Sequence, residues 1–319
     1  MEPGKFAAAY ALDWCVGDPD WLPHPVRLIG WSIDASERAL RRHGSGKRFE
    51  LAMGGLVAVG VPVLSALGVY ALLNHLRGNH PAIATAAEVW LASTCLSTRN
   101  LLDEAAEVMR ALESGDLQRA RLRLARIVGR DTDELGEAEI CRALVETLAE
   151  SLSDGVIAPL FYLAMGGVPV AMAYKAINTL DSMIGHKDEK HIYFGRVAAR
   201  VDDVANFVPA RISALLLCLA AELIPQTGGV RATQIWLRDG GKHDSPNAGQ
   251  VEAAMAGLLG VRLGGTNRYA GETIASPHLG GEFPLPNCKH ARCAWKAVGL
   301  ASLLGFGGAL FLALREKHG

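Results

Sequence analysis

Two long apolar runs are the most prominent feature of this chain. Residues 51–73 form 23 consecutive positions without a charged side chain, more than the about 20 that a helix needs to cross a bilayer. Residues 156–180 are equally apolar apart from Lys175, but a Gly-Gly-Val-Pro motif at 166–169 interrupts them. Glycine and proline at that position predict a broken or re-entrant helix, because proline cannot complete the helical hydrogen bonding.

Four shorter apolar stretches accompany these runs, at residues 5–16, 83–97, 209–224 and 298–314. The first is too short to span a bilayer and is expected at the interface, and the last is near the lower limit for spanning. Residues 83–97 contain Glu88 and fit either a segment that returns only part of the way across the bilayer or an interfacial helix. Because strand-like alternation is missing, the pattern predicts an all-α polytopic integral membrane protein with broken or re-entrant helices and cytoplasmic helical segments.

Polar helices are predicted between the apolar runs. Residues 100–113 and 116–128 should form an antiparallel hairpin joined by Ser114-Gly115, since glycine favours a helix end and a turn. The second helix carries a row of arginines at helical spacing, which either meets phosphate or anionic lipid groups or pairs with the first helix. We favour pairing between Arg119, Arg123 and Arg126 on one helix and Asp103, Glu107 and Glu113 on the other.

A charged helix leads into the broken run. Its apolar positions recur every four residues, with charged positions on the opposite side: Ile140, Leu144, Leu148 and Leu152 against Glu139, Arg142, Glu146 and Glu150. Asp131, three residues before Glu134, predicts the helix start, and residues 153–155 predict its end. The charged face is either solvated, with an Arg142–Glu146 surface pair worth about 0.2–0.5 kcal/mol, or it presents functional carboxylates.

Further polar residues follow the broken run. Asn178 and Asp181 share a helix face, and His186, Asp188 and the pair Asp202-Asp203 come after them. Paired carboxylates without a basic partner suit Mg²⁺. Alternatively, Arg196 and Arg200 neutralise these carboxylates.

Composition supports a membrane protein and excludes several soluble classes. Half of the residues are apolar and 20% are charged, with positive mean hydropathy. The net charge of −1 and the lack of a basic run with interleaved aromatic residues exclude nucleic acid as a partner. The six scattered cysteines are expected to be reduced. Basic residues at 41–48 place the start of the 51–73 run in the cytoplasm.

Five sequence blocks resemble the signature blocks of the CobD/CbiB family, the adenosylcobinamide-phosphate synthases of cobalamin biosynthesis. They occur in family order at residues 13–30 (DWCVGDPDWLPHPVRLIG), 129–135 (GRDTDEL), 145–161 (VETLAESLSDGVIAPLF), 177–211 (INTLDSMIGHKDEKHIYFGRVAARVDDVANFVPAR) and 245–271 (SPNAGQVEAAMAGLLGVRLGGTNRYAG). Several blocks in one order are far more specific than a single motif. Ser151 departs from the family, where we expect asparagine more often after Ala-Glu, so a direct role for position 151 is in doubt.

The resemblance implies a multi-pass ligase of the inner membrane with its active site facing the cytoplasm. Such an enzyme uses ATP as co-substrate, with Mg²⁺ and no prosthetic group, to join the corrin-ring propionate carboxylate of adenosylcobyric acid to aminopropanol or aminopropanol phosphate. The expected partners are therefore this corrinoid, the amine, ATP and the lipid bilayer; a homo-oligomer or a complex with other cobalamin-biosynthesis membrane enzymes stays open. The alternative is a membrane transporter or corrinoid-binding membrane protein, since such proteins also contain intramembrane breaks.

The site residues that the resemblance and the residue types suggest form three groups. The candidate catalytic residues are Glu146, Glu150, Asp154 and Asp181. The candidate substrate-binding residues are Asp18, His24, Arg130, Asp131, Asn178, Arg211, Ser245 and Asn247. The candidate Mg²⁺ ligands are Asp181, Asp202 and Asp203. We expect them to meet in one cavity of a single membrane-embedded domain over residues 1–319, which has a polar helical insertion at 99–155 and a polar cytoplasmic segment at 238–296.

Overall fold

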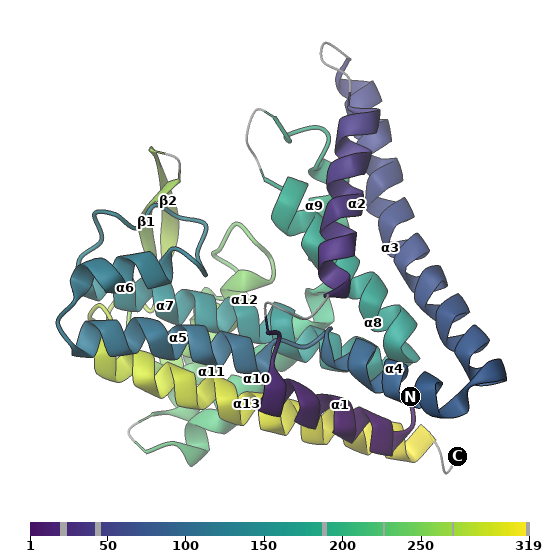
Figure 1. Ribbon diagram of the computed structural model, residues 1–319. Helices are drawn as coiled ribbons and strands as arrows, with labels where there is room; N and C mark the ends of the chain where they lie inside the picture. Colours follow the sequence, from purple (N-terminus) through teal and green to yellow (C-terminus); the bar gives the residue numbers. More distant parts are fainter. Residues whose placement is uncertain (20–23, 42–45, 187–189, 226, 270, 317–319) are drawn as a thin grey trace. The chain divides into compact units, whose positions relative to one another are not determined.

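The chain folds into two compact units. The computed structural model describes residues 1–19, 24–41, 46–186, 190–225, 227–269 and 271–316. Unit 1 comprises Met1–Ser97, Ala158–Asn206 and Gly307–Gly319, and unit 2 comprises Thr98–Ile157 and Phe207–Phe306. Both units are mostly helical (Figure 1), which confirms the predicted all-α class. The single domain over residues 1–319 stays a prediction.

Unit 1 is a group of helices arranged around α3 and α8. Helix α3 packs against α4, α8 and α9, helix α2 packs against α3 and α8, and α1 packs against α4. Proline occupies the first turn of α1, α2 and α4, where its missing N–H costs no hydrogen bond. The helices are α1 (Pro3–Val16), α2 (Pro25–Leu40), α3 (Lys47–Asn79), α4 (Pro81–Ser93), α8 (Ala158–Ile184) and α9 (Arg196–Ala205).

Within the part of the chain that the structure describes, three helical stretches are long and apolar enough to cross a membrane: Lys47–Asn79, Glu137–Ile184 and Cys288–Arg315. Helix α3 leaves large apolar side chains such as Leu56, Val59 and Leu64 exposed. A soluble monomer rarely exposes apolar side chains in such numbers along one helix, whereas lipid covers them without cost. The chain therefore has the character of a membrane protein, as its sequence predicts.

The predicted interruption of the second apolar run is confirmed. Within α8, Gly167 has φ 68° and ψ −162°, in a region of backbone conformation that residues with a Cβ rarely adopt. Pro169 follows two residues later. The regular helix is broken at this position, although the structure does not test whether the segment re-enters the bilayer.

The predicted start of the charged helix is wrong, whereas its predicted end agrees with the structure. Helix α7 begins at Glu137 rather than near Asp131, because the Glu139 carboxylate accepts a hydrogen bond from the N–H of Gly136 (3.1 Å) and caps the helix there. The α-helix ends at Leu152, directly before residues 153–155, although the chain does not form a turn there. Ser153–Ile157 form a π-helix, η1, that joins α7 to α8, because its wider winding accommodates an additional residue while the chain stays helical.

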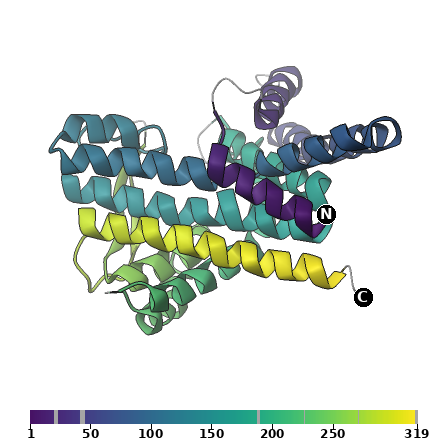
Figure 2. The same cartoon turned by 60° about the horizontal axis from the view of Figure 1, so that its bottom comes forward.

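Unit 2 surrounds the nearly fully buried helix α12, which packs against α7, α10 and α11. A hydrogen bond from Trp295 Nε1 to the Leu102 carbonyl oxygen (2.9 Å) joins α13, the yellow helix in Figure 2, to α5. The elements are α5 (Thr98–Glu113), α6 (Leu117–Leu124), α7 (Glu137–Leu152), η1 (Ser153–Ile157), α10 (Phe207–Leu223), α11 (Gly229–Asp239), α12 (Ala248–Leu259), β1 (Leu263–Tyr269), β2 (Glu272–Leu279) and α13 (Cys288–Glu316).

The predicted helical hairpin is confirmed, and of the predicted acidic partners Glu107 pairs with the arginine row. Helices α5 and α6 pack together, and the connecting Gly115 has φ 73°. Arg123 approaches Glu107 at 3.7 Å, and Arg126 approaches Glu104 at 2.7 Å. The other predicted partners, Asp103 and Glu113, instead pair with Arg99 and Arg292. The arginine row of α6 is therefore neutralised by acidic residues of α5, as we favoured.

The segment at 238–296 differs from its description as polar. It contains the buried helix α12 and an antiparallel β1–β2 hairpin that the sequence did not predict. Most of β2 is exposed and its residues do not alternate between apolar and polar, so the usual strand signal is missing. Helix α13 also begins ten residues before the apolar run at 298, because Asn287 Oδ1 accepts hydrogen bonds from the N–H groups of Lys289 and His290.

Candidate functional site

A buried ion cluster in unit 2 is centred on Glu146 of α7. One carboxylate oxygen, Oε2, lies 2.6 Å from Nη2 of Arg130. The other, Oε1, accepts hydrogen bonds from the N–H of Gly264 (2.8 Å) and from Nη1 of Arg142 (3.2 Å). Glu146 is 3% exposed and Arg142 is 4% exposed. The interpretation of this face as solvated is therefore wrong for both residues, because tertiary packing covers them.

Arg142 connects α7 to the hairpin. Its guanidinium donates to the carbonyl oxygens of Gly264 (2.9 Å) and Thr266 (3.1 Å) and to Oδ1 of Asn267 (2.9 Å). Gly264 has φ 77°, and a Cβ at this position would lie 2.1 Å from the Pro277 carbonyl oxygen. Only glycine therefore fits where β1 turns its backbone toward the charged cluster.

The GRDTDEL segment lies along the same hairpin. Arg130 Nη1 donates to Asn267 Oδ1 (2.9 Å), and the Asp131 N–H donates to the Arg268 carbonyl oxygen (2.8 Å). The Asp131 carboxylate accepts from the N–H of Gly271 (2.8 Å) near the hairpin tip. Burial tends to lower the pKa of Arg130, but the nearby Glu146 carboxylate outweighs it and raises that pKa. Arg130 therefore stays charged in the cluster.

Two further carboxylates lie beside this cluster. Glu252 of α12 is 7% exposed and interacts electrostatically with Glu146, Glu150, Arg130 and Arg142. Burial, followed by repulsion from Glu146 and Glu150, raises the pKa of Glu252 well above its usual range. Glu150 lies one turn beyond Glu146 on α7 and is exposed. Of these two carboxylates, Glu150 is therefore exposed and Glu252 is buried.

Arg211, Ser245 and Asn247 also belong to unit 2. Arg211 Nη1 approaches Oδ1 of Asn247 at 3.4 Å and lies over the ring of Phe207. The Ser245 hydroxyl accepts from the N–H groups of Asn247 (3.4 Å) and Ala248 (3.2 Å) at the start of α12. Ser245 therefore shapes the loop before α12, and Arg211 is the cation that lies next to it.

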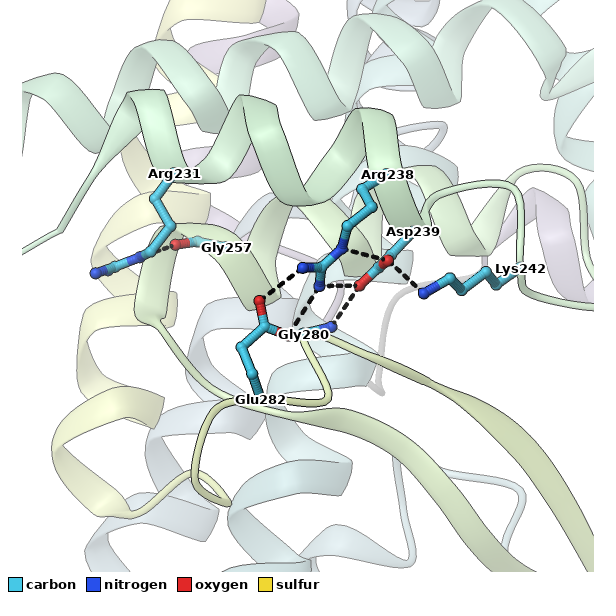
Figure 3. Close-up of polar contacts among 7 residues, drawn as sticks. All are labelled: Arg231, Arg238, Asp239, Lys242, Gly257, Gly280 and Glu282. Atoms are coloured by element: carbon cyan, nitrogen blue, oxygen red, sulfur yellow. Dashed lines mark hydrogen bonds and ion pairs between the residues drawn. The ribbon is translucent and has the colours of Figure 1, made fainter.

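A second polar group fixes the far end of the hairpin (Figure 3). Asp239, which is 0% exposed, accepts hydrogen bonds from Arg238 (2.8 Å), from Lys242 Nζ (2.5 Å) and from the Gly280 N–H (2.8 Å). Arg238 also binds Glu282 at 2.8 Å. The hydrogen bond from Arg238 holds the pKa of Asp239 well below its usual range, and the contact with Lys242 lowers it further. Burial acts in the opposite direction but has the smaller effect. This group lies at the C-terminal end of α11 and anchors the residues after β2.

In unit 1, Asp18 and His24 form a pair. His24 Nε2 lies 3.0 Å from Oδ1 of Asp18, while its Nδ1 accepts from the N–H of Val26 (3.2 Å) at the start of α2. The Val26 N–H is one of the donors that a helix start leaves unsatisfied, so the imidazole acts as a cap. Asp18 and His24, two of the candidate substrate-binding residues, are therefore in direct contact.

The predicted Mg²⁺ ligands also lie in unit 1. Asp181 of α8 interacts electrostatically with Asp203 of α9 and with His186. Asp203 approaches Arg200 at 3.3 Å, and Asp202 accepts from Asn206, whose Oδ1 accepts from the Tyr174 hydroxyl (2.8 Å). Arg200 thus partly neutralises the Asp202-Asp203 pair, which agrees with the alternative interpretation of these carboxylates. Asn178 lies one turn before Asp181 on α8. Asp188 lies outside the described residues.

Asp181 and Asp203 fit a Mg²⁺ ion only in part. Among the described residues, no group of three His, Cys, Asp or Glu side chains is arranged to hold a metal ion. Mg²⁺, however, commonly uses one or two carboxylates together with water and substrate phosphates. Two mutually repelling carboxylates meet that smaller requirement, so these two residues would hold the ion if a nucleotide supplied the remaining ligands.

The predicted site residues are therefore divided between the units. Unit 2 contains Arg130, Asp131, Glu146, Glu150, Arg211, Ser245 and Asn247, with Asp154 in η1, and in it Glu146 contacts Arg130 while Arg211 contacts Asn247. Unit 1 contains Asp18, His24, Asn178, Asp181, Asp202 and Asp203. Their convergence on one cavity stays a prediction. An open groove of about 470 Å³, lined by Leu51, Arg196, Val197, Arg200, Val201 and Val204, contains none of them.

Sequence reasoning did not select four members of the buried cluster as site residues: Arg142, which it named only as part of a possible surface pair, and the three residues Glu252, Gly264 and Asn267. All three lie in the block at 245–271, which was used only as a whole. A signal existed for Glu252, because it is the sole charged residue between 248 and 261, in an apolar stretch. A lone carboxylate in an apolar helix is costly to bury and therefore indicates a specific role.

Comparisons with known proteins agree with the five sequence blocks. The family model described as CobD/Cbib protein matches residues 6–298. A "Cobalamin biosynthesis protein CobD" from Klebsiella pneumoniae is 49% identical over 86% of this chain and 86% of its own length. Its namesake from Citrobacter koseri is 45% identical over 96% and 95%, and a "Cobalamin biosynthesis protein CbiB" from Salmonella typhi is 49% identical over 85% of both chains. No solved structure matches the chain.

Proposed function

Since this chain belongs to the CobD/CbiB family of cobalamin biosynthesis proteins, we propose that it is a membrane-embedded ligase that forms an amide bond. It joins the corrin-ring propionate carboxylate of adenosylcobyric acid to aminopropanol or aminopropanol phosphate, with ATP as co-substrate. The product is adenosylcobinamide or its phosphate. The active site faces the cytoplasm of the inner membrane, because ATP is available there.

The observation that carries this proposal is the buried cluster of Arg130, Arg142, Glu146 and Glu252. Moving a charged side chain out of water costs about several kcal/mol per ion. Close ion pairs and hydrogen bonds within the cluster must offset this cost. Such groups, with a strongly shifted pKa among them, are found preferentially at functional sites. Three of the four residues, Arg130, Glu146 and Glu252, lie in the sequence blocks that define the family resemblance, which supports a catalytic rather than a purely structural role.

An amide ligation of this kind needs three chemical functions. The carboxylate must acquire a good leaving group, which phosphorylation by ATP supplies, and the amine must be uncharged to attack. The phosphate charges must also be balanced during transfer. Arg211 of unit 2 suits the last function as a partly exposed guanidinium, and Mg²⁺ held by Asp181 and Asp203 would supply further neutralisation when bound. Glu146 holds Arg130 and Arg142 in place.

A direct assay tests the proposal. Purified protein in detergent is supplied with adenosylcobyric acid, ATP, Mg²⁺ and either aminopropanol or aminopropanol phosphate, and the products are identified by mass. We expect an amide-linked corrinoid that depends on ATP, with release of ADP and phosphate. Failure to form an amide with either amine would overturn the proposal.

The alternative function is a membrane transporter or corrinoid-binding membrane protein. The break at Gly167 within an apolar helix favours it, because transporters bind substrates at such breaks. A transporter would move corrinoid into protein-containing vesicles and return it chemically unchanged. Recovery of an amide product in the same vesicles would exclude transport as the sole activity.

A further inference from the structure

The groove of about 470 Å³ between α3 and α9 has no part in the proposed function. Its lining combines apolar side chains with two arginines: Leu51 from α3, and Arg196, Val197, Arg200, Val201 and Val204 from α9. Helix α3 packs on α9 beside it, and a Cβ at Gly55, one turn after Leu51, would lie 3.6 Å from Val197 Cγ2. Both helices belong to unit 1, so the groove lies within one compact unit.

The apolar side chains of this groove indicate a hydrocarbon occupant. Val197, Val201 and Val204 recur at spacings of four and three residues, so they share one face of α9. Val204 is 77% exposed, and α3 is long and apolar enough to cross a membrane. An exposed apolar surface beside a spanning helix marks a place where lipid acyl chains, rather than water, cover the protein.

The two arginines distinguish this groove from a surface that only faces lipid. Arg196 and Arg200 lie one turn apart on α9, and both are exposed. In the described part of the chain, Arg196 makes no hydrogen bond or ion pair. Arg200 approaches Asp203 at 3.3 Å, but its side chain is 74% exposed, and an exposed pair of this kind contributes little. Arg196 is therefore available to an anion, and Arg200 can share that anion with it.

The groove lies near one end of the spanning helix. Lys47, the first residue of α3, precedes Leu51 by one turn, and its Nζ lies 5.1 Å from the centre of the Tyr193 ring. Arg196 is the first residue of α9, where the helix dipole favours an anion. The basic residues at 41–48 predict that this end of α3 is cytoplasmic. Apolar wall and cations therefore meet where the acyl chains of a bilayer give way to headgroups.

We propose that the groove binds one anionic phospholipid, with an acyl chain against the valines and the phosphate group between Arg196 and Arg200. Arginine suits this position because its planar guanidinium binds two phosphate oxygens at once. Its aliphatic stem also lies along an apolar surface while the charged head stays at the interface. This lipid site is independent of the proposed ligase activity.

A phospholipid fits this lining better than a soluble phosphate compound such as ATP. Four of the six lining side chains are apolar, and a nucleotide triphosphate would leave them in water. A phospholipid satisfies both parts of the lining, because it carries a hydrocarbon chain and a phosphate. An anionic headgroup is favoured over phosphatidylcholine, whose own cation lies beside its phosphate and is repelled by the guanidinium groups.

Native mass spectrometry of the full chain in mild detergent tests the proposal. The bound fraction is measured for dioleoyl phosphatidylglycerol and for dioleoyl phosphatidylcholine, which has the same acyl chains but no net charge. Arg196→Gln removes a cation of the groove, and Val204→Gln places an amide in its apolar wall. The matched control is Arg48→Gln, which removes one positive charge at the same end of α3 from a residue that does not line the groove.

We expect wild-type protein to bind phosphatidylglycerol more tightly than phosphatidylcholine. Arg196→Gln should reduce this preference by a factor of about five, which is the contribution of one Arg or Lys near an anionic lipid surface. Val204→Gln should weaken the binding of both lipids and keep the preference, because only contact with the acyl chain is lost. Arg48→Gln should match wild type with both lipids.

Three results would decide against the inference. Equal binding of the two lipids by wild-type protein would show that the arginines do not select an anion. Equal losses in Arg196→Gln and Arg48→Gln would assign the preference to general surface charge, and displacement of phosphatidylglycerol by ATP would make the groove a nucleotide site. Arg196 and Val204 are both exposed, so the variants should fold, and unfolding midpoints close to wild type in detergent without lipid verify this.

Discussion

The Arg130 guanidinium lies 2.6 Å from the Glu146 carboxylate, and packing leaves only 11% and 5% of the two side chains exposed although they come from a loop and from a helix. An exposed pair of this kind would be worth about 0–1 kcal/mol. A buried pair behaves differently, because removing one partner leaves the other charge buried without compensation. A substitution at Glu146 is therefore expected to lower the stability of the protein more than the loss of an exposed ion pair would.

We predict that Glu146→Gln destabilises the protein as well as reducing its activity. The substitution leaves Arg130 and Arg142 buried without their carboxylate, at a cost of about 3–5 kcal/mol. Denaturant or thermal unfolding in detergent measures this loss. The control is Glu104→Gln, which breaks the pair with the exposed Arg126 and should cost about 1 kcal/mol or less. Equal effects of both substitutions would contradict the buried assignment.

A second prediction concerns the pH dependence of the Asp239 anchor. The pKa of Asp239 is lowered in the folded protein, so its contribution to stability is complete above the unfolded pKa of about 3.9. That contribution is lost as pH falls through the lower, folded pKa. We expect Asp239→Asn to be less stable than wild type at neutral pH, and the difference to shrink below about pH 4. Unfolding midpoints measured across this range would show a constant difference if the assignment is wrong.

Glu252 has the opposite effect on the pH dependence of folding stability. Since it is raised in the folded protein, the folded state binds more protons than the unfolded state above pH of about 4.3. Stability therefore decreases as pH rises from there toward the folded pKa. We expect Glu252→Gln to remove this decrease, so that the variant matches or exceeds wild-type stability at neutral pH. Thermal unfolding of wild type and Glu252→Gln over pH 4–8 measures this difference. If both proteins lose stability equally as pH rises, the pKa of Glu252 is not raised.

Two glycines of α3 give a matched test of packing in unit 1. A Cβ at Gly54 would lie 1.8 Å from the Phe194 carbonyl oxygen, whereas a Cβ at Gly60 would have nothing within 4 Å. Gly54→Ala should therefore displace the segment that carries Phe194 and lower the unfolding temperature. Gly60→Ala should be neutral or stabilising by up to about 1 kcal/mol, because alanine favours the helix. Similar midpoints for the two variants would show that α3 does not contact this segment closely.

The candidate Mg²⁺ site makes a prediction for activity alone. Asp181→Asn removes one of two mutually repelling carboxylates while keeping the side-chain shape, so the fold should survive. We expect ATP-dependent amide formation to fall by a factor of about 10² to 10⁴, with a higher Mg²⁺ requirement. Asp103→Asn on α5, where the carboxylate pairs with an exposed arginine, should be silent. Near-normal turnover of Asp181→Asn would remove Asp181 from the active site.

The amino-acid sequence by itself determined the features that depend on neighbours along the chain. The uncharged run at 51–73 predicted the span in α3, and the Gly-Pro motif predicted the break that occurs at Gly167. The α5–α6 hairpin followed from Ser114-Gly115, and the order of sequence blocks identified the family. Hydrophobic periodicity, turn residues and block order are local or one-dimensional signals, so they could be recognised without coordinates.

Only the tertiary structure decided which polar residues are buried and with what partners. Periodicity placed Arg142 and Glu146 opposite the apolar face of α7, but it could not show that the β1–β2 hairpin covers them. It gave no reason to associate Glu252 with Glu146, which are far apart in the chain and lie together because α7 packs on α12. The free energy of a charge depends on the groups that surround it in space, and long-range packing sets those groups.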